Sequence, residues 1–234
     1  MSEWWTYRLE DFLLFSPRTY WRMFELHNEA LWPLQIPALL LGATILVWVV
    51  RTPPWSGRVV SISLAAAWIW VAWAFLWNRY ATINWAASYA VPAFAVQALL
   101  LAWFGVLRGH LHFTASWTGH GVVGLTLLLY AIILHPLVAI LAGRSIQAAE
   151  VFGIAPDPTA IATLGLVSIV AGGSAALLLL VVPLAWCVVS WATLHTMGSP
   201  EGWLPLAAAV LTAASRIMSR PGSVERRDPG DKCH

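Results

Sequence analysis

The sequence predicts an all-helical protein, a polytopic bundle of about seven transmembrane helices preceded by an amphipathic helix at the membrane surface. Hydrophobic residues make up 59% of the 234 residues and charged residues only 10%, whereas a soluble domain has about 25% charged residues. The mean hydropathy is +0.71, and the apolar residues gather in long runs. This composition excludes nucleic-acid-binding proteins, solvated disordered chains and collagen-like repeats, because those classes need polarity or repeats that the chain lacks.

Four apolar runs have the length of a membrane span. A helix crosses a hydrocarbon layer ~30 Å thick with about 20 mostly apolar residues, at about 1.5 Å per residue. Each run is closed by an arginine or by a polar turn, as at Arg51 and at Asn78. The four predicted spans are residues 31–50, 59–77, 86–107 and 122–142.

The second half of the chain contains a shorter apolar run. Asp157 is predicted to cap a helix and Pro158 to occupy its first position. The run that follows has about 13 residues, which is short for a full crossing. The segment 159–171 is therefore either a fifth span or a re-entrant segment. Two further runs complete a total of about seven crossings, namely residues 175–194, with Pro183 as a kink, and residues 203–217.

Lysines and arginines near the span ends predict the orientation, because cytoplasmic segments carry an excess of them. With seven spans and a cytoplasmic C-terminus, the inside segments carry eight such residues and the outside segments carry five. This bias predicts that the N-terminus lies outside. The eight are Arg51, Arg58, Arg108, Arg216, Arg220, Arg226, Arg227 and Lys232, and the five are Arg8, Arg18, Arg22, Arg79 and Arg144.

The segment before the first span has an amphipathic pattern. Its apolar residues repeat on one helix face, and Ser16 followed by Pro17 is typical of a cap that restarts the helix. A helix in the membrane interface is favoured, with docking to a soluble partner as the alternative. The predicted organisation is an interfacial segment at 1–27, a helix bundle at 28–218 and a disordered cytoplasmic tail at 219–234. The first residues on the apolar face are Trp5, Leu9, Phe12 and Leu13.

The chain has 16 tryptophans, several times the ordinary usage. Many of them fall at predicted span ends, where indole rings anchor membrane proteins. Trp70, Trp73 and Trp77 differ, because they share one face within the second predicted span. Packing against lipid or a neighbouring helix is the favoured interpretation, and an aromatic wall that stacks on a ligand is the alternative.

The polar candidates inside the predicted bundle are Gln97, His135 and His195. An interhelical hydrogen bond is the favoured role of Gln97, and a ligand contact is the alternative. His135 and His195 fall near the outer ends of their spans, a placement that admits a haem-binding pair. The histidines between the third and fourth spans lack carboxylate or thiol neighbours. The sequence therefore predicts no metal, no cofactor and no catalytic residue.

A second polar group is predicted on the outer face of the membrane. Glu25 and Asn28 end the interfacial segment, Arg79 and Asn84 lie between the second and third spans, and Asp157 lies between the fourth and fifth. An ion-pair network that joins Arg79 to Glu25 or Asp157 is the favoured interpretation. A binding vestibule is the alternative.

Four stretches together resemble a family of small bacterial integral membrane proteins that is catalogued as a domain of unknown function. They are FSPRTY at 15–20, FEL at 24–26, INWAA at 83–87 and PDPTAIATLG at 156–165. The resemblance covers the chain except its tail and implies a bacterial inner membrane. Members of that family are often labelled permeases of the major-facilitator type, a fold of two six-helix halves. The resemblance supplies no substrate, cofactor or catalytic residue.

We therefore expect a non-enzymatic membrane protein, a permease-like carrier or channel component that acts in the lipid bilayer as a homo-oligomer or in a larger membrane complex. An accessory or scaffold subunit of such a complex is the first alternative, because charge-free, tryptophan-rich spans also suit lateral packing. A membrane haem protein or enzyme is the second. No nucleic-acid partner is expected.

Overall fold

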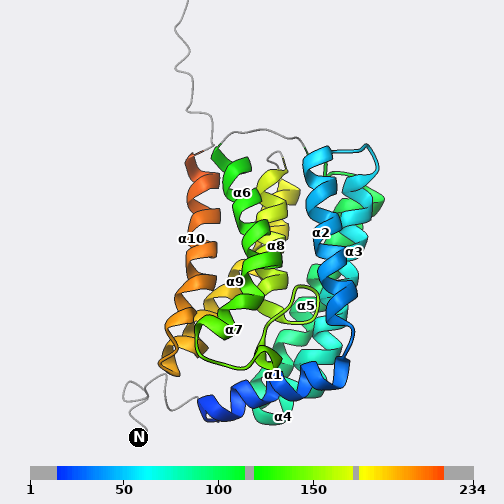
Figure 1. Ribbon diagram of the computed structural model, residues 1–234. Coiled ribbons are helices and arrows are strands. Elements are labelled where there is room, and N and C mark those ends of the chain that lie inside the picture. Colours follow the sequence, from blue (N-terminus) through cyan, green and yellow to red (C-terminus); the bar gives the residue numbers. More distant parts are fainter. Residues whose placement is uncertain (1–14, 114–118, 171–173, 219–234) are drawn as a thin grey trace, which may run out of the picture.

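The computed structural model describes residues 15–113, 119–170 and 174–218, and every regular element in them is helical (Figure 1). The predicted apolar face of residues 5–13 and the predicted tail lie outside the described residues. The first half of the chain forms α1 (Pro17–Leu31), α2 (Gln35–Arg51), α3 (Ser56–Trp70), η3 (Val71–Tyr80), α4 (Ala81–Ile83), η4 (Trp85–Tyr89), α5 (Ala90–Leu101) and η5 (Ala102–Leu107). The second half forms α6 (Gly119–Leu129), η6 (Tyr130–Leu134), η7 (His135–Leu137), α7 (Val138–Leu141), η8 (Ile146–Ala148), α8 (Pro156–Ile169), α9 (Ser174–Thr196), η9 (Pro200–Gly202) and α10 (Trp203–Met218).

Four continuous helical stretches are long and apolar enough to cross a membrane. They are Ser56–Ile83, Trp85–Leu107, Gly119–Leu141 and Ala175–Thr196, and they correspond to four of the predicted spans. The other predicted spans correspond to α2, α8 and α10, which have 17, 14 and 16 residues. The structure thus supports four candidate membrane spans.

The helix α1 lies across one end of the bundle, and the bend between α1 and α2 is 92° (Figure 1). Ser16 caps α1 as predicted, because its hydroxyl accepts a hydrogen bond from the Thr19 amide at 3.2 Å and Pro17 takes the first helical position. The predicted first span began at residue 31, but the helix restarts only at Gln35. Pro33 has no amide hydrogen to continue the helix, which explains the break.

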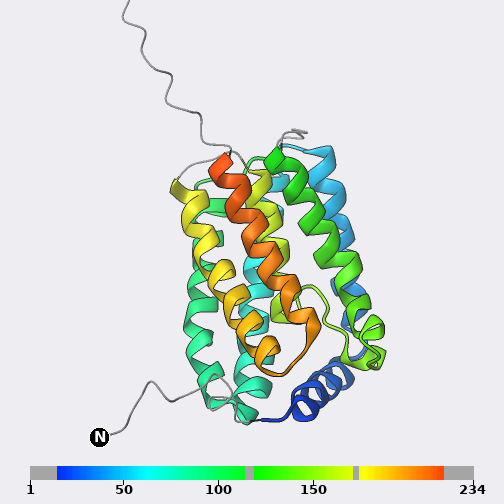
Figure 2. The same cartoon turned by 90° about the vertical axis from the view of Figure 1, so that its left-hand side faces the viewer.

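The short helix α8 occupies the centre of the bundle, and all 14 of its residues are buried. It packs against α6, α9 and α10, and α10 covers it in the view of Figure 2. The closest approach is between Gly165 of α8 and Gly124 of α6, where a Cβ atom on Gly165 would lie 2.7 Å from the Gly124 carbonyl oxygen. Glycines permit such contact between helix backbones, as is common in membrane proteins.

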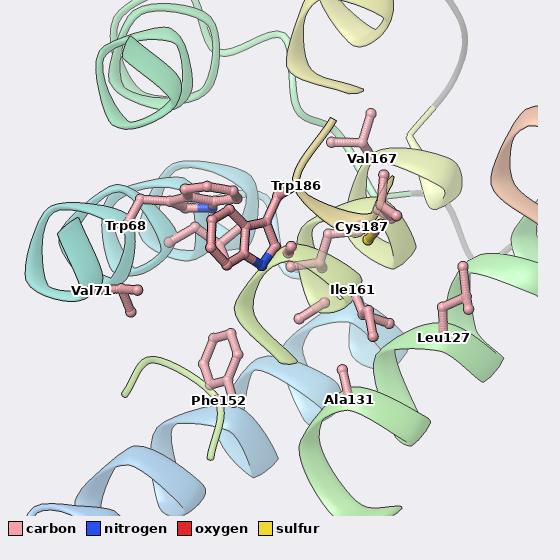
Figure 3. Packing of buried hydrophobic residues seen from close by; sticks show 14 of the residues in the cluster. Trp68, Val71, Leu127, Ala131, Phe152, Ile161, Val167, Trp186 and Cys187 are labelled. Carbon is pink, nitrogen blue, oxygen red and sulfur yellow. The ribbon is translucent and has the colours of Figure 1, made fainter. Parts of the chain in front are cut away.

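Two tryptophans hold α8 to its neighbours, and they lie close to the apolar residues around α8 in Figure 3. Trp68 of α3 donates from its indole nitrogen to the Thr163 hydroxyl at 2.9 Å. Trp186 of α9 donates in the same way to the Asp157 carboxyl at 2.7 Å. These buried bonds fix the position of α8 along the bundle axis, because an indole N–H without a partner is costly in an apolar interior.

The start of α8 differs from the prediction by two positions. The helix begins at Pro156 after the capping residue Ala155. Asp157 and Pro158 are therefore its second and third residues. Pro156 suits the first position, because its fixed φ is helical and it lacks the amide that would have no partner there. The Asp157 carboxyl, meanwhile, is occupied by donors from α9.

The outer surface of the bundle is apolar. Trp73 and Trp77 are 57% and 58% exposed, and Trp70 is half-buried, so this tryptophan face points away from the core. Its exposure agrees with outward packing against lipid or another protein and not with a ligand wall inside the bundle.

We predict that Gly165→Ala lowers the free energy of unfolding by about 1–3 kcal/mol, because its new methyl group meets the backbone of α6. Gly119→Ala is the matched control: it replaces a glycine of α6 whose Cβ position has no atom within 4 Å, so its stability should be unchanged or raised by up to about 1 kcal/mol. Denaturant unfolding of the detergent-extracted protein measures both. Equal stability of the two variants would show that α6 and α8 do not meet closely at Gly165 and Gly124.

Candidate functional site

Between η8 and α8, the chain runs into the bundle as irregular backbone. Residues 148–155 form no helix after Ala148, yet all of them except Gly153 are buried. Gly153 has a φ of +75°, which a side chain would disfavour. Buried irregular backbone needs hydrogen-bond partners for its amides and carbonyls. Part of that demand is met locally, since the Gly153 amide donates to the Thr159 hydroxyl at 2.9 Å.

The helix α1 supplies further partners from its buried face. The Asn28 side-chain amide donates to the Gln147 carbonyl at 2.7 Å and to the Ala149 carbonyl at 2.8 Å. The ring of the preceding residue, His27, is hydrogen-bonded to the backbone of Ile154. From the sequence, Asn28 was expected in a polar cluster on the outer face. The structure shows that its amide secures the irregular segment.

The irregular segment brings Glu150 into the bundle, where it joins His135 of η7 and Asp157 of α8. We call these three buried ionisable side chains the inner cluster. They are 5%, 8% and 3% exposed. The His135 Nε2 and Glu150 Oε2 atoms are 3.9 Å apart, and the charges of all three residues act on one another. Isolated charges are expensive in such an environment, and membrane proteins that retain them commonly use them for function.

Asp157 and Glu150 differ in how well they are bonded. Asp157 accepts from the Trp186 indole and, at 2.5 Å, from the Ser190 hydroxyl, so both carboxyl oxygens have donors from α9. Glu150 Oε2, in contrast, is buried without a hydrogen-bond partner among the described residues. In the inner cluster, both oxygens of the Asp157 carboxyl group therefore have hydrogen-bond donors, whereas Oε2 of Glu150 could still accept a hydrogen bond.

A widened helical turn positions His135 beside Tyr130. The His135 amide bonds to the Tyr130 carbonyl five residues earlier, in the pattern of a π-helix. This spacing places the two rings edge to face, with centroids 5.4 Å apart, and His135 Nδ1 lies 3.1 Å from the Tyr130 hydroxyl. His135 thus connects a phenol on one side to a carboxyl group on the other. Such a chain of titratable groups is suited to passing a proton.

A cleft of about 810 Å³ opens beside α1, at the end of the bundle that α1 crosses. We call it the arginine cleft, because Arg18, Arg22, Arg79 and Arg144 line it. The Arg22 guanidinium bonds to Glu25 at 2.7 Å, and this bond, with a second from Ser145, holds the pKa of Glu25 below its usual value.

Three of the five residues predicted on the outer face line the cleft or lie beside it, and two serve elsewhere. Glu25 and Arg79 line it, and Asn84 caps the following turn by accepting from the Ala86 amide at 3.1 Å. Asn28 and Asp157 point into the bundle instead. The expected ion pairs of Arg79 with Glu25 or Asp157 are therefore wrong. Glu25 pairs with Arg22, which is three residues away on the same helix, and Asp157 bonds to α9.

The other intramembrane candidates have separate surroundings. Gln97 is fully buried and donates from α5 to the Leu179 carbonyl of α9 at 3.0 Å, the interhelical role that the sequence favoured. His195 packs between the rings of Trp191 and Trp203, with ring centroids 5.6 and 5.7 Å away. His135 belongs to the inner cluster, so the two histidines considered for haem have different partners. Within the described residues, no three His, Cys, Asp or Glu side chains form a group that could hold a metal ion.

The pairing of Glu150 with His135 and the donors Trp186 and Ser190 were not predicted from the sequence. One signal was present: Glu150 stands within the run AAEVFGIA at 148–155, in which it is the only charged residue. A carboxyl group in an apolar run after a short loop indicates burial more strongly than it indicates a surface position.

These features define an all-helical protein that has four helices able to span a membrane and ionisable side chains buried among them. A family model described as "Family of unknown function (DUF6064)" matches residues 18–222, and the chain belongs to this family. The match confirms the predicted kinship with a family of unknown function, and it includes the inner cluster and the arginine cleft. No curated protein and no solved structure gives a significant match.

The buried histidine of α1 gives a pH-dependent prediction. Burial, followed by the nearby charge of Arg79, lowers the pKa of His27 to about 4 from 6.5. The unfolded chain binds a proton at this residue below pH ~6.5 while the folded chain excludes it, so the contribution of His27 to stability is lost as the pH falls from ~6.5 toward ~4. The full loss is about 3 kcal/mol.

His27→Asn should flatten this part of the profile, because asparagine does not titrate and its amide can still bond to Ile154. Denaturant unfolding between pH 7 and pH 4 measures the free energy of unfolding of both proteins. The contributions of other titrating groups are the same in both and cancel in the difference. Parallel profiles for the two proteins would refute the assignment.

Proposed function

We propose that this protein is a permease-like membrane carrier whose inner cluster binds and releases protons during transport. In this proposal the chain crosses a bacterial inner membrane seven times, with its N-terminus outside and its C-terminus in the cytoplasm. The arrangement of the helices supports this count, because α2, α8 and α10 lie alongside the four longer spans, and α1 and the end of α10 are at opposite ends of the bundle (Figure 1). The helix α1 then lies in the membrane interface, with its aromatic side against the bundle.

The observation that carries the proposal is the interrupted crossing formed by residues 148–169. Irregular backbone at membrane depth is tolerated only where protein or a water-filled cavity surrounds it. Carriers use such interruptions, because the helix end and the unwound backbone provide polar groups close to the bilayer midplane. Here the interruption is buried, α8 begins beside it, and the inner cluster lies at the junction.

The chemistry of the inner cluster supports proton coupling. A carrier that uses a proton gradient needs a group whose charge changes between its two states, and buried carboxyl and imidazole groups serve this purpose. Glu150 has an oxygen without a partner, and His135 lies between Glu150 and the Tyr130 hydroxyl. Uptake of a proton by Glu150 or His135 from outside the cluster, and its later release, would change the charge of the cluster.

The test uses proteoliposomes that contain a pH-sensitive dye, to which a panel of small anions (inorganic phosphate, sulfate, acetate and citrate) is added under an imposed pH gradient. We predict that at least one anion accelerates proton entry relative to empty liposomes. Glu150→Gln and Asp157→Asn should reduce the rate to that of empty liposomes, because neither amide can carry a proton. His112→Gln is the matched control, since His112 is an exposed ionisable residue outside both the inner cluster and the arginine cleft, and it should transport at the wild-type rate.

Wild-type liposomes that are no faster than empty ones with any of these anions would contradict the proposal. The alternative of an accessory subunit in a larger membrane complex would then be preferred, because the exposed tryptophan face also suits lateral packing. Transport that persists unchanged in Glu150→Gln and Asp157→Asn would instead remove the inner cluster from the mechanism.

A further inference from the structure

We propose that the arginine cleft is a binding site for a phosphate group or another compact oxyanion of the same charge. Three separate segments deliver its four arginines. Arg18 and Arg22 lie one turn apart on α1, Arg79 lies on η3, and Arg144 follows α7. A cluster assembled from such distant parts of the chain is unlike a solvated run of charges on one helix face. All four arginines line one volume of about 810 Å³.

Two of the four arginines are already paired. Arg22 bonds to Glu25 at 2.7 Å and approaches Glu29 at 3.9 Å. Arg144 bonds to Glu201, and its guanidinium carbon lies 3.5 Å from the centre of the Trp21 ring. These contacts hold both guanidinium groups in place, which lowers the entropy that a bound anion would have to overcome.

The other two arginines have no carboxylate partner among the described residues. Arg18 is exposed and Arg79 is half-buried, and neither forms an ion pair within the part of the chain that the structure describes. A cation in this condition favours an anion from solution. The cleft therefore combines two positioned arginines with two that have unused donors.

The geometry of arginine indicates the class of ligand. A guanidinium group presents a planar fork of N–H donors that matches two oxygens of a phosphate or carboxylate. Several arginines that line one volume suit a tetrahedral oxyanion, which has oxygens on all sides, and Thr19, Thr82 and Ser145 also belong to the lining. Inorganic phosphate, a phosphorylated solute and a phospholipid headgroup share this chemistry.

The cleft is also next to the inner cluster. Tyr20 follows the cleft residue Thr19 and is buried, and it is close enough to Arg144, Glu150 and Asp157 for their charges to act on its phenol group. An anion held by the arginines would lie at the bundle end from which the irregular segment enters. That this anion is the transported solute rests on the proposed function, whereas binding to the cleft does not.

Isothermal titration calorimetry of the detergent-purified full chain with sodium phosphate, at low ionic strength, tests the site. The expected result is saturable binding that Arg79→Gln and Arg18→Gln each weaken about tenfold or more, because each removes a charge-assisted contact. Arg51→Gln removes an exposed arginine from the opposite end of the bundle and should change the affinity less than about twofold. Equal weakening by all three variants would reduce the effect to net charge and overturn the proposal.

A second arm identifies the source of the phosphate group. Short-chain phosphatidylglycerol is added to wild-type protein and to Arg79→Gln in detergent, and the melting temperatures are compared. If a lipid headgroup fills the cleft, this lipid stabilises the wild type more than the variant and competes with phosphate. If the ligand is a soluble oxyanion, phosphate binds and the lipid does not compete. Absence of any arginine-dependent binding by both probes would refute the site.

These outcomes separate the two proposals. Binding of phosphate to the cleft without proton-linked transport in liposomes would retain the site and remove the carrier function. Transport without binding to the cleft would retain the carrier function and remove the site.

Discussion

The burial of α8 on every side is the constraint on which the rest of the structure depends. A helix of 14 residues can occupy the centre of a bundle only if its neighbours approach closely, and the contact of Gly165 with Gly124 provides that approach. Because α8 covers only about 21 Å at 1.5 Å per residue, the chain must complete its path through the bundle by other means. It does so as the buried irregular segment 148–155, which brings Glu150 into the interior.

The helix α1 connects this interior to the surface. Its buried face carries His27 and Asn28, whose side chains satisfy backbone groups of the irregular segment. Its opposite face carries Arg18 and Arg22, which line the arginine cleft. A single helix thus stabilises the interruption of the bundle and forms the wall of the opening beside it. A rotation or tilt of α1 would alter both at once, which is the coupling that a carrier needs between its solute and proton sites.

Much of the helical framework could be predicted from the sequence, because long apolar runs and capping residues are local signals. The four long spans and the Ser16 cap follow from them. The central position of α8 could not be predicted in this way. Its small and apolar residues have no preferred face, so the sequence indicated an unusually short helix without showing that other helices surround it completely.

The candidate site was less predictable for a different reason. The order of the spans places Glu25, Arg79 and Asp157 near one end of the bundle. Which residues they bond to, however, depends on which of the neighbouring groups reaches each of them most easily. Arg22 reaches Glu25 with little loss of chain entropy because it is one turn away, so the distant Arg79 is left without that carboxylate. The proximity of His135 to Glu150 depends on the π-helical turn and on the irregular segment, neither of which has a clear sequence signal.

The most direct test of this account asks whether the segment 148–169 carries the chain through the membrane. Topology reporters fused to the two ends of the full chain measure this, because a complete crossing makes the number of spans odd. The account predicts that the N-terminal reporter is active only in its extracytoplasmic form and the C-terminal reporter only in its cytoplasmic form. Activity of both reporters on the same side of the membrane would contradict it, since the segment would then turn back within the bundle.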